Sequence, residues 1–401
     1  MIKRLGKLTV AIAALSLSVG TLTGCDAAKD SSNGNSGYSL VTSITVPAST
    51  AKQAVTVSGL DTASDMVNEI VFDANGTIYI DGAASSLGTY FDYDYSAQRI
   101  NGAYSSYFRF LWSSGSTAPG FMSPVNHAMV GDFPAGDYTY YITNPNTSDV
   151  TVNIYRAYKK DSNFGGGALT LNFFVYTVGG ANSVISSAAD VELIKNFMNS
   201  IFRQVGVEIG TINLEFREDA SAVDMVSSQS GLNQFLYAAS KGTAGRSDVG
   251  INCFLMPILP NGLVGMDGSI PGPGFIHGTG TSGLVALAAP MGYVFPGYSS
   301  HESDQVYLAL TLAHEIGHYL GLYHPSERTG STHDPLTDTA ECTKSYDTDH
   351  DGIVSGPECR GVNTEYLMFW TDDNGYLTSG NFQTGISGQQ GQVINTHPSI
   401  L

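Results

Sequence analysis

Charged residues are scarce in this sequence, and basic residues are the scarcest of them. Only 13% of the 401 residues are charged, with 18 Lys and Arg against 36 Asp and Glu. So few charges disfavour long salt-bridged helices and favour short strands and turns. The net charge of −18 repels nucleic acids and anionic lipids, which argues against a nucleic-acid-binding protein. No internal repeat is visible, and no apolar run is long enough to span a bilayer as a mature helix. Hydrophobic residues, at 42%, exclude wholesale disorder.

The N-terminus has the pattern of an export signal. Basic residues precede a short apolar run, Leu8 to Val19, which is followed by Leu22-Thr23-Gly24-Cys25. These four residues resemble the lipobox of bacterial lipoproteins. The resemblance implies cleavage before Cys25, acylation of that cysteine, and membrane attachment through the lipid. An ordinary signal peptide with a nearby cysteine is the alternative.

We expect four segments: a signal peptide (1–24), a flexible tether (25–38), an all-β domain (39–162) and a second folded domain (163–401). The tether contains Ser31 to Gly37, which has no apolar residue to pack. We therefore expect a lipid-anchored protein of the bacterial cell envelope that faces the periplasm or the exterior. Asp26, directly after Cys25, resembles an inner-membrane retention signal.

Alternating apolar and polar residues predict an N-terminal β-sandwich. The clearest strand-like segments are Val41–Val46, Ala54–Val57, Thr77–Ile80, Asp137–Ile142 and Val150–Tyr155. The tyrosines of Tyr90–Tyr95 are interpreted as half-buried sheet residues, with a recognition surface as the alternative.

A glycine-rich segment, Asp161–Gly167, is predicted to be an interdomain linker. After it the pattern becomes mixed α/β. Strands are expected at Leu169–Tyr176, Ile212–Phe216 and Val249–Ile258, and helices at Ala189–Val205 and Gln305–Leu322.

The segment from His314 to His324 carries three histidines at the spacing of a zinc site. His314 and His318 are four residues apart, so on a helix they project from one face. Gly321 falls where the helix must stop and reverse, because glycine readily takes a positive φ. The reversal would bring His324 back as a third ligand. Three protein ligands leave one tetrahedral position open, as in catalytic zinc sites.

Glu315 follows the first histidine and is not needed as a ligand. Its carboxylate can take a proton from a water that attacks a carbonyl and pass it to the leaving amine. The sequence therefore predicts a peptide-bond hydrolase acting on protein or peptide substrates. Histidines that merely pack on a helix, or a zinc site without catalysis, are the alternatives.

This extended motif resembles the metzincin clan of zinc endopeptidases. The resemblance implies a methionine turn beneath the zinc, for which Asn363–Trp370 is the candidate, with Met368 as the supporting residue. Several metzincins carry a tyrosine two residues after this methionine. Trp370 stands there in this chain, and its indole nitrogen can only donate a hydrogen bond; Tyr366 is the possible substitute.

Within the clan, the chain looks most like the pappalysin family and its bacterial relatives. The resemblance lies in Leu320–Pro325 and in Asp334–Thr339, where Ala340 follows in place of an expected proline. It further implies that a strand before the catalytic helix forms the sheet edge on which substrate lies. Leu284–Ala288 is the candidate, with a plain interior strand as the alternative.

A second metal site is predicted between His324 and the methionine turn. Asp347–Glu358 fits the twelve-residue calcium loop of EF-hand type, with Gly352 at position six. Cys342 and Cys359 flank this loop, and export makes a disulfide between them expected. A solvated acidic loop is the alternative. The predicted calcium ligands are Asp347, Asp349, Asp351, the Ile353 carbonyl, Ser355 and Glu358.

The sequence thus predicts a lipid-anchored, extracytoplasmic zinc endopeptidase, with an N-terminal β-sandwich followed by an α/β metzincin-like domain. Its cofactors would be Zn²⁺ and Ca²⁺. The rival is a surface binding or adhesion lipoprotein in which the peptidase domain is an idle scaffold. Glu315 favours the enzyme, because a scaffold needs no carboxylate beside a zinc ligand.

Overall fold

The computed structural model describes residues 36–60, 66–85, 88–94, 99–101, 120–123, 136–161, 164–178, 183–242, 250–274, 279–372, 377 and 379–401. The predicted signal peptide and Cys25 lie outside the described residues, as does part of the tyrosine-rich segment. Within the described ranges, no helix has both the length and the apolar character to cross a membrane.

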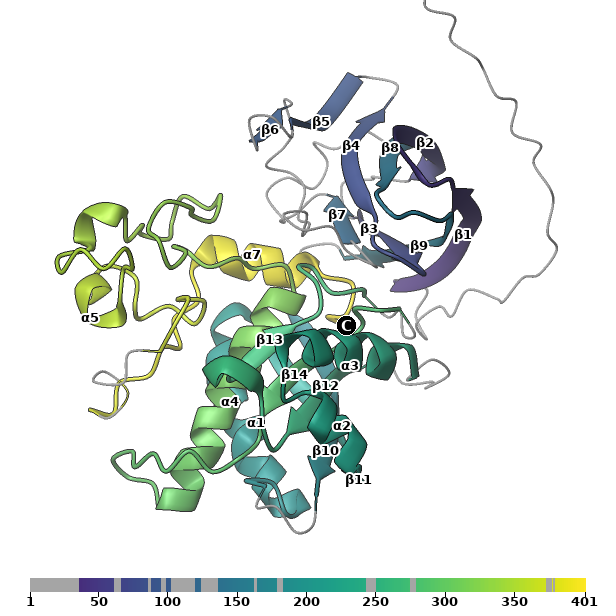
Figure 1. Ribbon diagram of the computed structural model, residues 1–401. Helices are drawn as coiled ribbons and strands as arrows, with labels where there is room; N and C mark the ends of the chain where they lie inside the picture. The colour runs from purple at the N-terminus through teal and green to yellow at the C-terminus, as the bar shows by residue number, and fades with distance from the viewer. Residues whose placement is uncertain are drawn as a thin grey trace, which may run out of the picture.

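The first part of the chain consists of two antiparallel sheets (Figure 1). One sheet has the order β1 (Ser36–Val46), β9 (Val150–Lys160), β3 (Met66–Ala74) and β7 (Gly120–Ser123). The other has the order β2 (Ser49–Leu60), β8 (Gly136–Asn144), β4 (Tyr79–Ser85), β5 (Gly88–Asp94) and β6 (Arg99–Asn101).

Residues from both sheets meet in one hydrophobic cluster. Alternate residues of β8 are buried: Tyr138, Tyr140 and Ile142 are fully covered. On the facing sheet, Phe72 of β3 packs edge-on against Tyr140, with ring centroids 5.2 Å apart. The period-two pattern of the sequence therefore separates a buried face from a more exposed one, as expected for packed antiparallel sheets.

The second part is built on one five-stranded sheet of mixed direction. Its order is β11 (Val207–Glu218), β10 (Gly167–Thr177), β12 (Ile251–Met256), β14 (Leu284–Leu287) and β13 (Gly265–Asp267). All neighbours pair in parallel except β13, which runs antiparallel along β14. The longer helices are α1 (Ala188–Phe202), α2 (Ala220–Met225), α3 (Gln229–Gly242), α4 (Ser300–Tyr319) and α7 (Gly388–Thr396).

Helices cover both faces of this sheet. On one face Leu171 and Phe173 of β10 pack into a cluster with α1 and α4. On the other face Phe174 and Tyr176 pack against α2 and α3. Since strands covered on both sides carry apolar residues at nearly every position, β10 reads as a continuous apolar run in the sequence.

The position of β14 corrects one sequence-based expectation. Leu284–Ala288 was the candidate edge strand, but β14 lies between β12 and β13. The edge strand next to β14 is β13, a three-residue strand too short to stand out as a pattern in the sequence. The interior-strand alternative for Leu284–Ala288 therefore holds.

The described C-terminal end of the predicted linker is packed rather than loose. Gly166 and Gly167 have φ values of 125° and 158°, and a Cβ on Gly166 would overlap the carbonyl of Gly206. The backbone of Ala168 pairs in both directions with Leu401. The last residues of the predicted linker are therefore held against the second part of the chain, close to the C-terminus.

Buried polar groups also connect the two parts. Glu69 of β3 is completely buried, and one of its carboxylate oxygens accepts the N–H of Gly274 at 2.8 Å. The Lys159 ammonium, also buried, donates to the carbonyl of Asn395 at 2.8 Å. Burial raises the pKa of Glu69 to about 8 and lowers that of Lys159 to about 8. Both groups therefore depend on the domain contact for their hydrogen bonds.

Candidate metal centre

Helix α4 presents the first two histidines of the motif. It begins at a capping box in which Ser299 and Glu302 bond reciprocally to each other's backbone N–H groups. Its residues are almost all buried against the sheet. His314 and His318 lie in its last turns on one face, with ring centroids 4.8 Å apart.

Gly321 ends the helix and reverses the chain. Its φ is 102°, in the region that favours glycine. The N–H of Gly321 reaches the carbonyl of His318, and the N–H of Leu322 reaches that of Gly317, at 2.8 and 2.9 Å. These bonds satisfy carbonyls at the helix end and return the chain so that His324 faces the helix.

The three imidazoles converge through their Nε2 atoms. Nε2 of His324 lies 3.2 Å from that of His314 and 3.0 Å from that of His318. Three nitrogens sharing a tetrahedral ion at about 2.0–2.1 Å would stand about 3.3–3.4 Å apart. The observed spacing is therefore close to what a single Zn²⁺ requires.

The opposite nitrogen of each ring has its own acceptor. Nδ1 of His314 contacts the carbonyl of Leu367, and Nδ1 of His318 that of Leu322, both at 2.8 Å. Nδ1 of His324 lies 3.1 Å from a carboxylate oxygen of Glu327. Acceptors at Nδ1 place the proton there and leave each Nε2 lone pair facing inward, as a metal ligand needs.

Burial keeps the two helical histidines, His314 and His318, in the metal-binding form. Loss of solvation lowers the pKa of His314 to about 3, with a further contribution from His324. Burial, and then the neighbouring His324 and His314, hold the pKa of His318 well below its usual range. Neutral imidazoles are ligands, whereas imidazolium ions are not.

Glu315 sits at the wall formed by β13. A Cβ on Gly265 would overlap its carboxylate, and the backbone N–H of Asp267 donates to it. Burial raises the pKa of Glu315 to about 8; a divalent cation beside it favours the ionised form. The carboxyl of Asp267 is also buried, and burial and then the charge of Glu315 raise its pKa well above the usual value. Nothing in the sequence pattern indicated that Asp267 would lie beside Glu315.

The methionine of the predicted turn lies directly against α4. Met368 is fully buried, and a Cβ on Gly317 would overlap its sulfur. Gly317 lies between the two helical ligands, and Leu367 holds His314. The segment therefore supports the ligands both through van der Waals contact and through one carbonyl.

Trp370 and Tyr366 do not direct a donor at the metal position. The indole N–H of Trp370 donates to the carbonyl of Val354 at 2.9 Å. The Tyr366 hydroxyl contacts the carbonyl of Asp338 at 3.4 Å. Neither residue therefore takes the role of the tyrosine found in several metzincins.

The histidines open into a cleft of about 810 Å³. Residues from β13, α4 and the methionine turn line it, together with Arg328 and Trp370. Asp372 also lines it and accepts the hydroxyl of Tyr307 at 3.0 Å. A cleft of this size accommodates several residues of a peptide.

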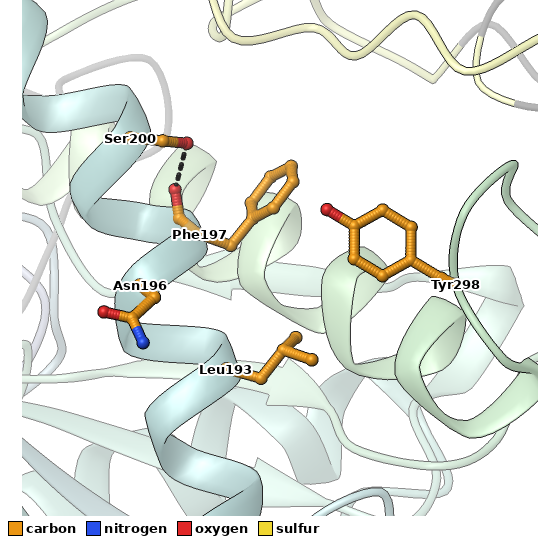
Figure 2. A pocket seen from close by; sticks show the side chains of 5 residues that line it. All are labelled: Leu193, Asn196, Phe197, Ser200 and Tyr298. Carbon is orange, nitrogen blue, oxygen red and sulfur yellow. Dashed lines mark hydrogen bonds between the residues drawn. The ribbon is translucent and has the colours of Figure 1, made fainter.

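A second hollow, of about 520 Å³, lies against the outer side of α1 (Figure 2). Leu193, Asn196, Phe197, Ser200 and Tyr298 line it, and the Ser200 hydroxyl donates to the Phe197 carbonyl of its own helix. This lining holds no carboxylate, imidazole or thiol, so it provides no set of metal ligands or acid–base pair.

The predicted calcium loop gathers three of its carboxylates. Asp347, Asp349 and Asp351 each offer an oxygen within 4.8 Å of the others. Glu358 is placed differently: one of its oxygens accepts the N–H and hydroxyl of Thr348, and the other those of Ser355. These bonds lower the pKa of Glu358 to about 2. The flanking disulfide, Cys342–Cys359, is confirmed.

Glu327 is a residue that the motif did not reveal, although it follows His324 by three positions. Because it orients the third ligand, we expect Glu327→Gln to weaken zinc affinity by about 10- to 100-fold. Competition with a fluorescent zinc chelator would measure this. Glu365→Gln, at an exposed carboxylate on the methionine turn, is the control. Equal affinities in the two variants would show that Glu327 does not orient His324.

Comparisons with known proteins give only distant similarity. No family model matches the chain, and no curated protein matches it. Among solved structures, mirolysin in complex with a small compound is 17% identical with a TM-score of 0.34, over 57% of this chain and 91% of that one. A promirolysin mutant from Tannerella forsythia is 17% identical with a TM-score of 0.36, over 58% of this chain and 83% of that one. Metalloproteinase-II from Bacteroides fragilis is 13% identical with a TM-score of 0.25, over 44% of this chain and 54% of that one. TM-scores this low do not establish a shared fold, so the site's own geometry has to carry the functional assignment.

Proposed function

We propose that this protein is a zinc endopeptidase. The observation that carries the proposal is the convergence of three Nε2 atoms, each with a hydrogen-bonded Nδ1, beside the buried carboxylate of Glu315. His314, His318 and His324 would hold the metal. Three nitrogens with one open position fit catalytic zinc better than a closed structural site.

The chain's own residues provide the remaining chemistry. Zinc, when bound there, supplies Lewis acidity. Glu315 takes a proton from the attacking water and delivers it to the leaving amine. The Asp267 N–H and the wall at Gly265 fix the orientation of the Glu315 carboxylate. Positioning of this kind lets one group serve first as base and then as acid.

Substrate would lie along the edge formed by β13. Among the described strands, β13 pairs only with β14, and its residues line the cleft beside the histidines. Extended peptides bind such edges through backbone hydrogen bonds. An edge strand running past the metal accommodates chain on both sides of the cleaved bond, which favours an endopeptidase over an exopeptidase.

The location and the first domain are part of the same proposal. The sequence of residues 1–25 supports a lipoprotein of the bacterial cell envelope, attached through Cys25. The two facing sheets that share one core are best described as a β-sandwich. Its buried contacts with the second part support a structural role rather than a freely moving binding module.

Hydrolysis of casein or gelatin by the purified chain tests the proposal. We expect cleavage that phenanthroline abolishes and that added Zn²⁺ restores. Cleavage that survives removal of the metal would contradict it. Binding of envelope components without any cleavage by the zinc-loaded protein would favour the rival, a binding or adhesion lipoprotein.

We further propose that Asp347, Asp349 and Asp351 bind a structural Ca²⁺. Asp347 is 7% exposed, and one of its carboxylate oxygens has no hydrogen-bond partner, as expected of an oxygen that serves a cation. Calcium should raise the melting temperature, and Asp351→Ala should abolish the rise. Differential scanning fluorimetry with and without Ca²⁺ measures both. An unchanged calcium-dependent shift in the variant would rule out this site.

A further inference from the structure

Val354 lies inside the Asp347–Glu358 loop and is hydrogen-bonded to two walls of the zinc cleft. Its N–H donates to the carbonyl of Arg328, and its own carbonyl accepts the indole N–H of Trp370, both at 2.9 Å. Arg328 and Trp370 line the cleft together with the three histidines. One residue of the acidic loop therefore holds both walls.

Each of the two wall residues is close in the chain to a residue that contacts a proposed zinc ligand. Arg328 follows Glu327, whose carboxylate contacts Nδ1 of His324. On the other side, Trp370 belongs to the same short turn as Leu367, whose carbonyl contacts Nδ1 of His314. A displacement of Val354 would therefore reach the substrate cleft and the ligand supports together.

The contact is rigid because the side chain of Val354 is packed on all sides. It is fully buried, in a cluster with Phe369 and the Cys342–Cys359 disulfide. Its Cγ1 also lies only 2.9 Å from where a Cβ on Gly330 would stand. Packed interiors move as units rather than deforming smoothly, so movement of the loop is transmitted to the walls.

The acidic end of the same loop is arranged for a cation. The N–H of Gly352 donates to Asp347, and that of Ile353 to Asp351, at 3.1 and 2.8 Å. The other oxygen of Asp347 is buried and unpaired, and three carboxylates within 4.8 Å repel one another without a counter-charge. An ion that holds Asp351 also fixes Ile353, the residue immediately before Val354.

We infer that Ca²⁺ bound by this loop controls the substrate cleft, by fixing Val354 and through it Arg328 and Trp370. The inference rests on the proposed calcium site and zinc peptidase activity. Calcium would tighten peptide binding, so that KM falls about five-fold or more while kcat changes less. Mg²⁺ should not replace it, because Mg²⁺ requires a smaller octahedral shell and keeps its waters.

Trp370 itself reports the coupling. The chain has two tryptophans, Trp112 and Trp370, so in zinc-loaded full-length Trp112→Phe all tryptophan emission comes from Trp370. Titration with Ca²⁺ should shift this emission to saturation. Adding Asp351→Ala should abolish the shift, whereas adding Glu192→Ala, which removes an equal charge from the exposed side of α1, should preserve it.

A second variant separates binding from coupling. Trp370→Phe removes the donor to Val354 but keeps an aromatic ring. It should retain the calcium-induced rise in melting temperature and lose the effect of calcium on KM. If calcium raises the melting temperature but leaves both Trp370 emission and KM unchanged, the coupling is wrong and the calcium site stands. If the zinc-loaded protein cleaves no peptide, the proposed peptidase function is wrong, and the emission titration still decides the coupling.

Discussion

Glu315→Gln should reduce kcat/KM for peptide hydrolysis by about 100- to 10,000-fold, the usual contribution of a general base. The variant keeps the shape of the side chain and an oxygen that can accept the Asp267 N–H. It loses the ability to take a proton from water. Zinc content should remain one ion per chain, because Glu315 is not among the three converging ligands.

Kinetics with a fluorogenic peptide and metal analysis on the same sample measure the two effects. Glu302→Gln is the matched control, because this carboxylate lies on the same helix at its far end. Wild-type rates in Glu315→Gln would mean that another group activates the water. Loss of zinc in that variant would mean that the role of Glu315 is structural.

Glu69→Gln should remove a large part of the pH dependence of stability. The pKa of Glu69 is raised from 4.5 to about 8 by burial. The folded state therefore holds a proton there that the unfolded chain releases at much lower pH. The contribution of Glu69 to the free energy of unfolding is fully present below about pH 4.5. It is lost as pH rises to about 8, a decrease of about a few kcal/mol in total.

Denaturant unfolding of the zinc-loaded protein between pH 5 and 8.5 measures this effect as the difference between wild type and variant. The difference is needed because neighbouring groups titrate as well. Burial lowers the pKa of His397 to about 4, so this group makes the free energy of unfolding rise with pH until the pKa of His397 in the unfolded chain is passed. Burial also lowers the pKa of Lys159 to about 8, so Lys159 makes the free energy of unfolding rise with pH above about pH 8. Tyr319 also faces Glu69, but its pKa is raised well above 10. Parallel pH curves would show that Glu69 is not protonated in the folded protein.

The sequence predicted those features that depend on local spacing. Histidines four residues apart identified the metal-facing side of α4, and Gly321 marked the reversal after it. The acidic pattern related Asp347, Asp349 and Asp351, which lie together, but not Glu358, whose oxygens bond to Thr348 and Ser355. The two cysteines beside this loop are bonded. In each case the residues that act together are close in the chain, so periodicity and turn chemistry are enough to relate them.

Features that depend on distant contacts were not predictable. Glu69 meets Gly274 across 205 positions of sequence, and no local pattern relates the two. Asp267 reaches Glu315 because β13 turns back along β14, a pairing set by the whole sheet. Helix α3 was missed because its residues are mostly small or polar, and its apolar side is defined only by the sheet it covers.

Through the proposed coupling of the Asp347–Glu358 loop to the cleft, the Cys342–Cys359 bond would make the cleft depend on oxidation state as well. It closes a 17-residue span around the acidic loop, and closing a span of this length restricts the unfolded chain by about 3 kcal/mol. Protein made in a reducing cytosol would have the same histidines, but its loop beside Phe369 and Val354 would not be closed by the disulfide. Two preparations with equal zinc content would then differ in activity according to the compartment in which each was made.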